Sequence, residues 1–217
     1  MGRKIISIAS ALVCLFLASW ASGQTVTDID GNVYTVVKIG KQSWTAQNLK
    51  TSRYRNGDSI AHLTNDSIWS ETTAGAWANY RNLPSFDSAY GKLYNWYAVT
   101  DRRGLCPKGW HVATDADWNY LTESLGGKTA AGAIKAARFW DPPNRGADDK
   151  NGFSAFGGGL RNYYGMFKTL GTFGYYWTST GTNRGTAWFR KLDCYDTKLG
   201  RDDVLKETGF SCRCVAD

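Results

Sequence analysis

The cysteine residues carry the clearest chemistry in this sequence. The chain has five cysteines, and two of them, Cys212 and Cys214, are one residue apart in the closing segment GFSCRCVAD. In an extended strand, positions two apart project from the same face, so both thiols would reach the same layer of neighbours. A bond between them would close a badly strained ring. Their partners are therefore expected elsewhere in the chain.

The N-terminal segment indicates the redox compartment. In MGRKIISIASALVCLFLASWASGQ, two basic residues precede an apolar run over residues 5–20, and small residues follow. This order is typical of a secretory signal peptide, and the run is shorter than the roughly 20 residues of a membrane-spanning helix. We expect residues 1–23 to be a cleaved signal peptide. Residues 24–217 would then be a single exported domain, secreted or at the extracellular cell surface, with no membrane span.

Four cysteines remain after this cleavage, and an even number in an oxidising compartment implies disulfides. Cys194 ends a strand-like run, AWFRKLDCY, which a polar segment joins to GFSCRCV, so a hairpin bond between Cys194 and Cys212 is the local choice. That pairing leaves Cys106 for Cys214. A zinc site is not expected, because the sequence has no C-x-x-C and its two histidines, His62 and His111, form no ligand pair.

The net charge of the chain bears on which partners it is expected to bind. The formal charge of +7 falls to +5 once Arg3 and Lys4 leave with the signal peptide. Lysine and arginine are spread along the chain without a basic tract, so nucleic acid is not an expected partner. A mildly cationic exported surface better suits acidic cell-envelope polymers.

Aromatic residues are dense, with ten tryptophans and twelve tyrosines. Aromatic faces with a polar edge suit stacking on sugar rings or packing at protein interfaces. Most should be core residues, and Trp110, Trp118, Trp177 and Trp188 are expected to be buried. Tyr163 and Tyr164 stand in a Gly/Asn-rich loop, where burial is harder. We expect a contact surface around residues 161–164, with the ligand-binding residues Arg161, Asn162, Tyr163, Tyr164, Trp140 and Tyr175.

The elements that must position these residues begin with an N-terminal antiparallel meander, with turns at Asp30-Gly31 and Gly40-Lys41. In WHVATDADWNYLTESLGG, Thr114 is a natural N-cap and Asp117 completes a capping box. Trp118, Leu121 and Leu125 share one face of this helix, and a Gly-Gly pair ends it.

Other segments are less clear. Residues 90–99 are ambiguous between strand and helix, and residues 128–140 are expected to add a short helix with Ile134 and Ala137 facing inward. After Asp141, the strand candidates GYYWTST, TAWFRKLD and TGFSCRCV are separated by loops. This pattern predicts a small antiparallel sheet with long loops, and the class is α+β.

The segments DIDGNVYTVVKIGKQSWTAQNL, YGKLYNWYAV, GLCPKGWHVATDADWNYL, GGGLRN, YYWTST, TAWFRKL and GFSCRCV together resemble the Fibrobacter succinogenes major paralogous domain, an exported bacterial family. More distantly, the chain is similar to the C-type lectin-like and formylglycine-generating-enzyme folds. The resemblance implies two helices, the first over residues 90–99, with a twisted antiparallel sheet, neighbouring termini and a large loop region. Family members commonly carry a cysteine in GLCP and another in RCV, which implies the Cys106–Cys214 bond. Ala113 departs from the proline usual before the cap.

The resemblance raises two activities that the residues do not support. The oxidative chemistry of formylglycine-generating enzymes uses a cysteine pair, and the corresponding stretch, GGGLRNYYGMFKTLGTFGYYW, has none. Calcium-dependent lectins use a Trp-Asn-Asp strand, whose place is taken by TAWFRKLD. The DDKNG segment fits either a structural calcium loop or a plain turn. Scattered acids such as Asp202 and Asp203 are most simply solvated.

We therefore expect a non-catalytic binding or surface-assembly module without cofactor or metal. Its partner would be an extracellular polysaccharide or a cell-surface protein, and the alternative is a subunit that self-assembles into a homo-oligomeric fibre or array. A sugar site would present exposed rings with Asn, Asp and Arg between them. An assembly face would present a broad apolar patch or an open edge strand.

Overall fold

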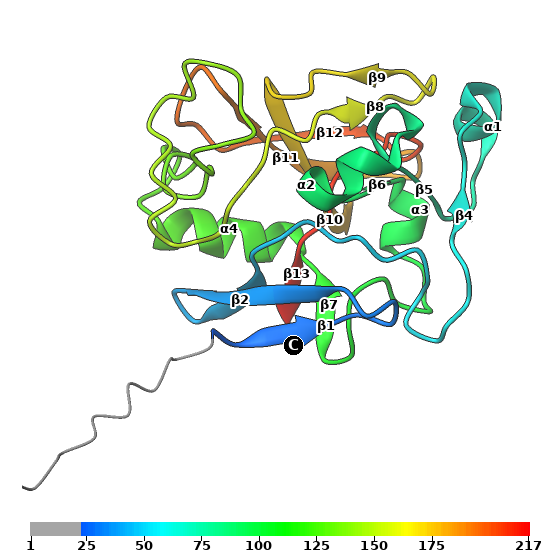
Figure 1. Ribbon diagram of the computed structural model, residues 1–217, viewed down its shortest axis with the longest axis horizontal. Coiled ribbons are helices and arrows are strands. Elements are labelled where there is room, and N and C mark those ends of the chain that lie inside the picture. The colour runs from blue at the N-terminus through cyan, green and yellow to red at the C-terminus, as the bar shows by residue number, and fades with distance from the viewer. Residues whose placement is uncertain (1–22) are drawn as a thin grey trace, which may run out of the picture.

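The computed structural model describes residues 23–217 (Figure 1), so the expected signal peptide lies outside the described residues except for Gly23. The strands are β1 (Thr25–Thr27), β2 (Val33–Ile39), β3 (Gln42–Thr45), β4 (Ala61–His62), β5 (Ala76–Ala78), β6 (Leu93–Tyr94), β7 (Trp110–Val112), β8 (Leu160–Arg161), β9 (Phe167–Lys168), β10 (Phe173–Gly181), β11 (Thr186–Asp193), β12 (Gly200–Leu205) and β13 (Cys214–Ala216). The helices are α1 (Asp66–Glu71), α2 (Asp87–Tyr90), α3 (Trp96–Val99) and α4 (Asp115–Ser124), with 3-10 turns η1 (Tyr80–Asn82) and η2 (Pro84–Phe86). None of the helices among residues 23–217 is long and apolar enough to cross a membrane.

One sheet joins the two ends of the chain. Its strand order is β1-β2-β3-β13-β7, and all its pairs are antiparallel. The meander expected from the glycine turns is present, with Gly31 and Gly40 in the left-handed region at φ 84° and 58°. Val215 of β13 lies between Trp44 of β3 and His111 of β7. In Figure 1 this sheet occupies the lower part of the molecule, and the C-terminus lies there.

A second antiparallel sheet, β10-β11-β12, carries the aromatic strands expected after Asp141. A parallel bridge between Tyr176 and Ser211 ties it to the tail of the chain. The smaller β4-β5-β6 sheet and the β8-β9 hairpin complete the strands. The described fold is thus mostly sheet with a few short helices, which is a more strand-rich arrangement than the predicted two-helix core.

Helix α4 forms as its capping box predicts. The Thr114 hydroxyl accepts from the Asp117 amide at 3.1 Å, and the Thr114 amide donates to the Asp117 carboxylate at 2.8 Å. Trp118 is fully buried and meets Trp44 edge-on, with ring centroids 5.1 Å apart. The cap therefore starts the helix, and the apolar face attaches it to the N-terminal meander.

The helix expected over residues 90–99 is wrong. Helix α2 ends at Tyr90, and Gly91 turns the chain with φ 71° where a Cβ would lie 2.7 Å from the Leu49 carbonyl oxygen. Strand β6 follows, and α3 is a single turn that Asn95 caps. The Tyr94 amide donates to the Phe210 carbonyl, so tertiary pairing interrupts the helix.

The helix expected over residues 128–140 is also wrong: the segment forms turns, and some of its backbone groups bond to other segments. The Ala131 amide donates to the Thr197 carbonyl at 3.1 Å, and Ala136 and Ala155 pair at 3.0 Å. Ile134 is buried as expected, but Ala137 is exposed.

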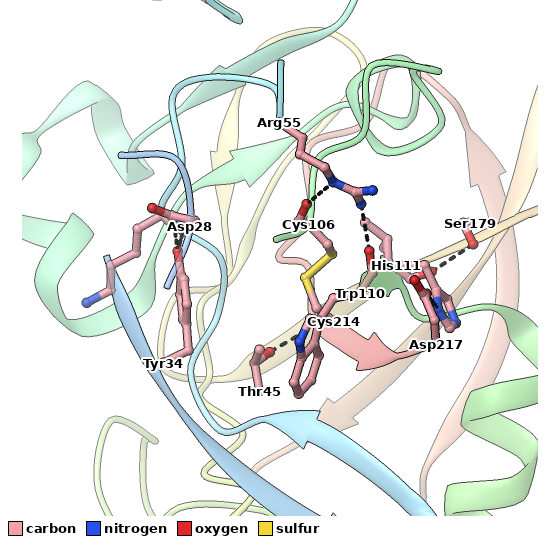
Figure 2. Close-up of a disulfide and its surroundings, with 12 residues drawn as sticks. Asp28, Tyr34, Thr45, Arg55, Cys106, Trp110, His111, Ser179, Cys214 and Asp217 are labelled. Carbon is pink, nitrogen blue, oxygen red and sulfur yellow. Dashed lines mark hydrogen bonds and ion pairs between the residues drawn. A yellow bond between two sulfur atoms is a disulfide. The ribbon is translucent and has the colours of Figure 1, made fainter. Parts of the chain in front are cut away.

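The Cys106–Cys214 disulfide joins the loop before β7 to the tail strand (Figure 2), with a Cα–Cα distance of 6.0 Å. Arg55 donates to the Cys106 and Trp110 carbonyls at 2.9 and 2.7 Å, and the Cys214 amide donates to the Thr45 hydroxyl at 3.1 Å. In the chain-entropy model, a bond across a sequence separation of 108 residues stabilises the fold by about 4–5 kcal/mol.

The expected Cys194–Cys212 bond is not formed, and both thiols are buried and form no disulfide within residues 23–217. Tyr176 pairs with Arg190 in the sheet and also with Ser211, next to Cys212. Cys194 lies four residues beyond Arg190, which at about 3.3 Å per residue is about 13 Å along the strand direction. Disulfides need Cα atoms within about 7 Å. Burial raises the pKa of the Cys212 thiol.

Candidate ligand-binding surface

The loop predicted to contact a ligand is the turn of the β8-β9 hairpin. The Asn162 amide donates to the Met166 carbonyl at 2.8 Å, and Gly165 donates back to the Asn162 carbonyl at 2.9 Å. The Asn162 side-chain oxygen accepts from the amides of Tyr164 and Met166, at 3.1 and 2.9 Å. The amide oxygen of Asn162 is therefore used to hold the turn.

Arg161, which the sequence suggested as a contact residue, is fully buried under this turn. Its guanidinium donates to the carbonyls of Leu63 and Thr64, to Gly165 and to the Asp66 carboxylate, the last at 2.8 Å. The guanidinium also lies 4.4 Å from the centroid of the Trp69 ring. With its donors used in this way, Arg161 ties the hairpin to the segment before α1 and has no surface left for a ligand.

Gly165 makes this close contact sterically feasible. A Cβ at this position would lie 2.5 Å from the Asp66 Cβ, and the residue has φ 92°. Glycine adopts this left-handed backbone without steric cost and leaves room for the approach of α1.

A hollow opens where the hairpin meets α1 and η1. Its volume is about 770 Å³, and it is a shallow depression that is widely open to solvent. We call it the hairpin hollow, and its lining residues are Thr64, Asn65, Asp66, Ser67, Arg81, Asn82, Met166, Phe167 and Lys168. Of the eight large apolar side chains exposed among the described residues, four belong to the segments around it: Ile68, Leu83, Tyr164 and Met166.

The charges of the hairpin hollow are incompletely paired. The carboxylate of its lining residue Asp66 is ion-paired with the buried guanidinium of Arg161. Arg81 and Lys168 are exposed and make no ion pair with any residue in the described range 23–217. Including the buried Arg161, the four charged groups carry a net charge of +2, which favours an anionic ligand.

The backbone of η1 is strained beside the hollow. Arg81 and Asn82 both lie in the left-handed region, at φ 54° and 57°. This conformation costs Arg81 about 1–2 kcal/mol, whereas asparagine adopts it readily, and such strain concentrates at functional sites. The Asn82 side-chain nitrogen donates to the Thr64 carbonyl at 3.0 Å, while its oxygen is buried without a hydrogen-bond partner. Asn82 therefore holds the wall of the hollow through its amide nitrogen, and its oxygen is enclosed by protein atoms.

The other predicted contact residues divide into two groups. Tyr163 is half-buried and Tyr164 is 60% exposed, with ring centroids 4.2 Å apart. Tyr175 is instead half-buried against the core, stacked on Phe210 at 5.0 Å, and Trp140 is half-buried with its indole nitrogen donating to the Ala155 carbonyl at 2.9 Å. Neither Tyr175 nor Trp140 lines the hairpin hollow.

The burial predicted for the four tryptophans is confirmed for Trp110, Trp118 and Trp177. Trp188 is only half-buried, because it lies on the outer side of β11 where the Arg201 guanidinium covers it at 3.3 Å from the ring centroid. The DDKNG segment forms a turn in which the Asp149 carboxylate accepts from the amide and hydroxyl of Ser154, at 2.8 and 2.7 Å.

A second hollow, of about 710 Å³, provides a contrast. We call it the Arg103 hollow; it is lined by Asn56, Asp58, Asp101, Arg102 and Arg103. Arg103 bonds to Asp101 at 2.8 Å and to Asp58 at 3.1 Å, and its guanidinium lies 4.0 Å from the Tyr54 ring centroid. The hydrogen bond from Arg103 lowers the pKa of Asp101 to about 2. Its two acids and two arginines sum to no net charge.

Sequence reasoning missed most of the hairpin hollow. No local sequence pattern links residues 64–67 and 81–82 to residues 166–168. The one usable signal was Arg161 itself, a charged residue directly after the apolar Leu160 in a glycine-rich stretch, which needs a partner elsewhere if it is buried.

Comparison with known proteins agrees with the resemblance seen in the sequence. No curated protein matches the chain, and no solved structure matches it. The family model of the Fibrobacter succinogenes major domain matches residues 37–216, from within β2 to the end of β13. The matched region contains both disulfide cysteines and all of the hairpin hollow. The chain therefore belongs to the Fibrobacter succinogenes major domain family.

Proposed function

We propose that this protein is an exported, non-catalytic binding module with a C-type lectin-like fold, and that it contacts extracellular polysaccharide through the hairpin hollow and the adjoining tyrosines. The observation that carries the proposal is the exposed ring of Tyr164 on a turn that Asn162 and Arg161 hold rigidly. An aromatic ring in a preorganised loop loses little conformational entropy when it binds.

The polar groups around the hollow support a sugar ligand. Asn65 and Ser67 are exposed and offer hydrogen-bonding groups near the tyrosine turn, which is the combination expected of a sugar site. Acid–base catalysis by a carboxylate pair has less support, because Asp66 is the hollow's lining carboxylate and is already paired with Arg161.

Self-assembly into a fibre or array is the second candidate, favoured by strand β12. This strand forms one edge of the β10-β11-β12 sheet, and Leu205 at its end is exposed. An open edge can pair with another chain. The exposed Asp202 and Asp203 on that edge oppose such pairing, since like charges would meet in a symmetric contact.

A glycan array combined with light scattering tests the proposal on residues 24–217. The Tyr164→Ala variant should lose about tenfold in affinity for the bound glycan while its thermal unfolding is unchanged, because the ring is mostly solvent-exposed. Tyr195→Ala is the matched control, since Tyr195 is 56% exposed at a distant position in the chain and should bind as wild type does. Concentration-dependent polymers without a glycan signal would overturn the proposal in favour of self-assembly.

A further inference from the structure

We infer that the ligand of the hairpin hollow is an anionic glycan whose sugar units carry carboxylate or sulfate groups, with Arg81 and Lys168 as its charge contacts. The inference rests on the proposed function and narrows it to a class of polysaccharide. Three features of the hollow carry it: positive charge without an ion-pair partner among residues 23–217, exposed neutral polar side chains and backbone strain.

The positive charge comes from two different elements. Arg81 belongs to η1 and Lys168 to β9, yet both line the same hollow. The lining carboxylate that could neutralise them, Asp66, accepts a 2.8 Å bond from the buried Arg161. A neutral sugar would leave both cations without a partner, whereas a carboxylate or sulfate group would pair with them through charge-assisted hydrogen bonds.

Neutral polar side chains in the hollow favour a glycan over a small inorganic anion. Asn65 and Ser67 are exposed and line the same hollow as the two cations. The Asn65 amide nitrogen and the Ser67 hydroxyl can hydrogen-bond to sugar hydroxyl groups. A glycan that carries both hydroxyl and anionic groups uses these side chains and the two cations together.

The strained backbone at Arg81 supports a ligand-binding role for its side chain. At φ 54° and ψ 21°, glycine would fit without steric cost, while arginine is disfavoured. The turn nevertheless carries a long cationic side chain, 5.9 Å from the Tyr80 ring centroid and unpaired with any acid in the described residues. A binding role for this charge accounts for the strained arginine.

Calorimetry on residues 24–217 with three oligosaccharides tests the inference: an oligogalacturonate, a sulfated galactan fragment and a neutral cello-oligosaccharide. We expect at least one anionic ligand to bind about tenfold or more tightly than the neutral one, and its binding to weaken as sodium chloride rises from about 50 to 500 mM. The two anionic arms distinguish carboxylate from sulfate recognition.

Charge-removing variants locate the contact. Lys168→Gln and Arg81→Gln should each weaken the anionic ligand about tenfold and leave the neutral ligand unchanged. Arg102→Gln is the matched control, because Arg102 lies in the Arg103 hollow. If Arg81→Gln fails to fold, Arg81→Gly removes the same charge and relieves the backbone strain.

The outcomes separate the two proposals. Equal affinity of wild type for anionic and neutral oligosaccharides overturns this inference, and the proposed function survives if Tyr164→Ala still lowers that affinity. Anionic binding that Lys168→Gln and Arg81→Gln weaken no more than Arg102→Gln also overturns it. Absence of binding to every oligosaccharide and to the glycan array overturns the proposed function itself.

Discussion

The hairpin hollow and the Arg103 hollow are similar in volume, about 770 and 710 Å³, but they differ in how their charges are paired. In the Arg103 hollow, one arginine bridges two carboxylates on the surface. In the hairpin hollow, the buried Arg161 is ion-paired with Asp66. The exposed Arg81 and Lys168 line the same hollow and have no ion-pair partner among residues 23–217. The charges of the Arg103 hollow neutralise one another, whereas the hairpin hollow has positive charge left to bind an anion.

The two hollows also differ in how far apart their partners lie in sequence. Arg103 bonds to Asp101, two residues before it, and to Asp58, 45 residues before it. Arg161 bonds to Asp66, 95 residues away, and so joins two parts of the fold. The volume of a hollow therefore says little about its function. Which residues pair with its charged groups says more.

The largest effect is expected when Arg161 is removed. Arg161→Ala leaves a cavity and deprives the carbonyls of Leu63, Thr64 and Gly165 of their donor, so the free energy of unfolding should fall by about 3 kcal/mol. Urea denaturation measures the loss. Asp66→Asn is the control: its side chain is 57% exposed, and the change should cost less than about 1 kcal/mol. Equal costs for the two variants would contradict a structural role for Arg161.

A matched pair of glycine substitutions separates backbone strain from close contact. Gly165 and Gly57 have nearly the same φ, 92° and 94°, but only Gly165 lies against a neighbour, Asp66. Gly57→Ala, in the turn of the Arg103 hollow, should cost about 1 kcal/mol from strain alone. Gly165→Ala should cost about 1–3 kcal/mol more, because the added methyl group pushes the hairpin away from α1.

Thermal and urea unfolding of both glycine variants provide the measurement. The oligosaccharide affinity of Gly165→Ala should fall as well, whereas that of Gly57→Ala should not change. A Gly165→Ala protein as stable as Gly57→Ala would mean that the contact with α1 is looser than described.

The smallest expected effect is a loss of stability at acid pH when Asp101 of the Arg103 hollow is protonated. The pKa of Asp101 is lowered from 3.8 to about 2, chiefly by the hydrogen bond from Arg103. Because the folded-state pKa is lowered, this pair stabilises the fold fully above about pH 4. That stability is lost as the pH falls through about 2.

An NMR titration of the Asp101 carboxyl group in wild type and Arg103→Gln tests this pairing. The midpoint should lie near 2 in wild type and move toward 3.8 in the variant. A wild-type midpoint near 3.8 would show that the Arg103 hollow is not self-neutralised, and the contrast with the hairpin hollow would disappear.

Local features were predictable from the sequence because their bonds connect neighbours. The Thr114–Asp117 capping box lies within four residues, and the glycine turns at Gly31 and Gly40 need only their own backbone conformations. The family resemblance also identified the Cys106–Cys214 bond. Tyr164 was placed correctly at the surface for a local reason, since its turn is rich in glycine and asparagine.

Other features depended on partners that no local pattern reveals. Residues 90–99 are split because Tyr94 pairs with Phe210, and residues 128–140 stay non-helical because they bond to Thr197 and Ala155. The expected Cys194–Cys212 bond is absent because β10 pairs with β11 and with Ser211 in a register that keeps the two cysteines apart.

By itself, the sequence determined the caps, the turns, the strand-rich tail and the family, because hydrogen bonds and steric limits within a few residues decide them. Only the tertiary structure decided that Arg161 is buried beneath the turn where it was expected to contact a ligand, and that Arg81 and Lys168 line one hollow without an ion-pair partner among residues 23–217. The physical reason is that burial and charge pairing depend on which distant segments meet. Here the meeting of residues 64–67, 81–82 and 166–168 turns separate polar loops into one candidate site.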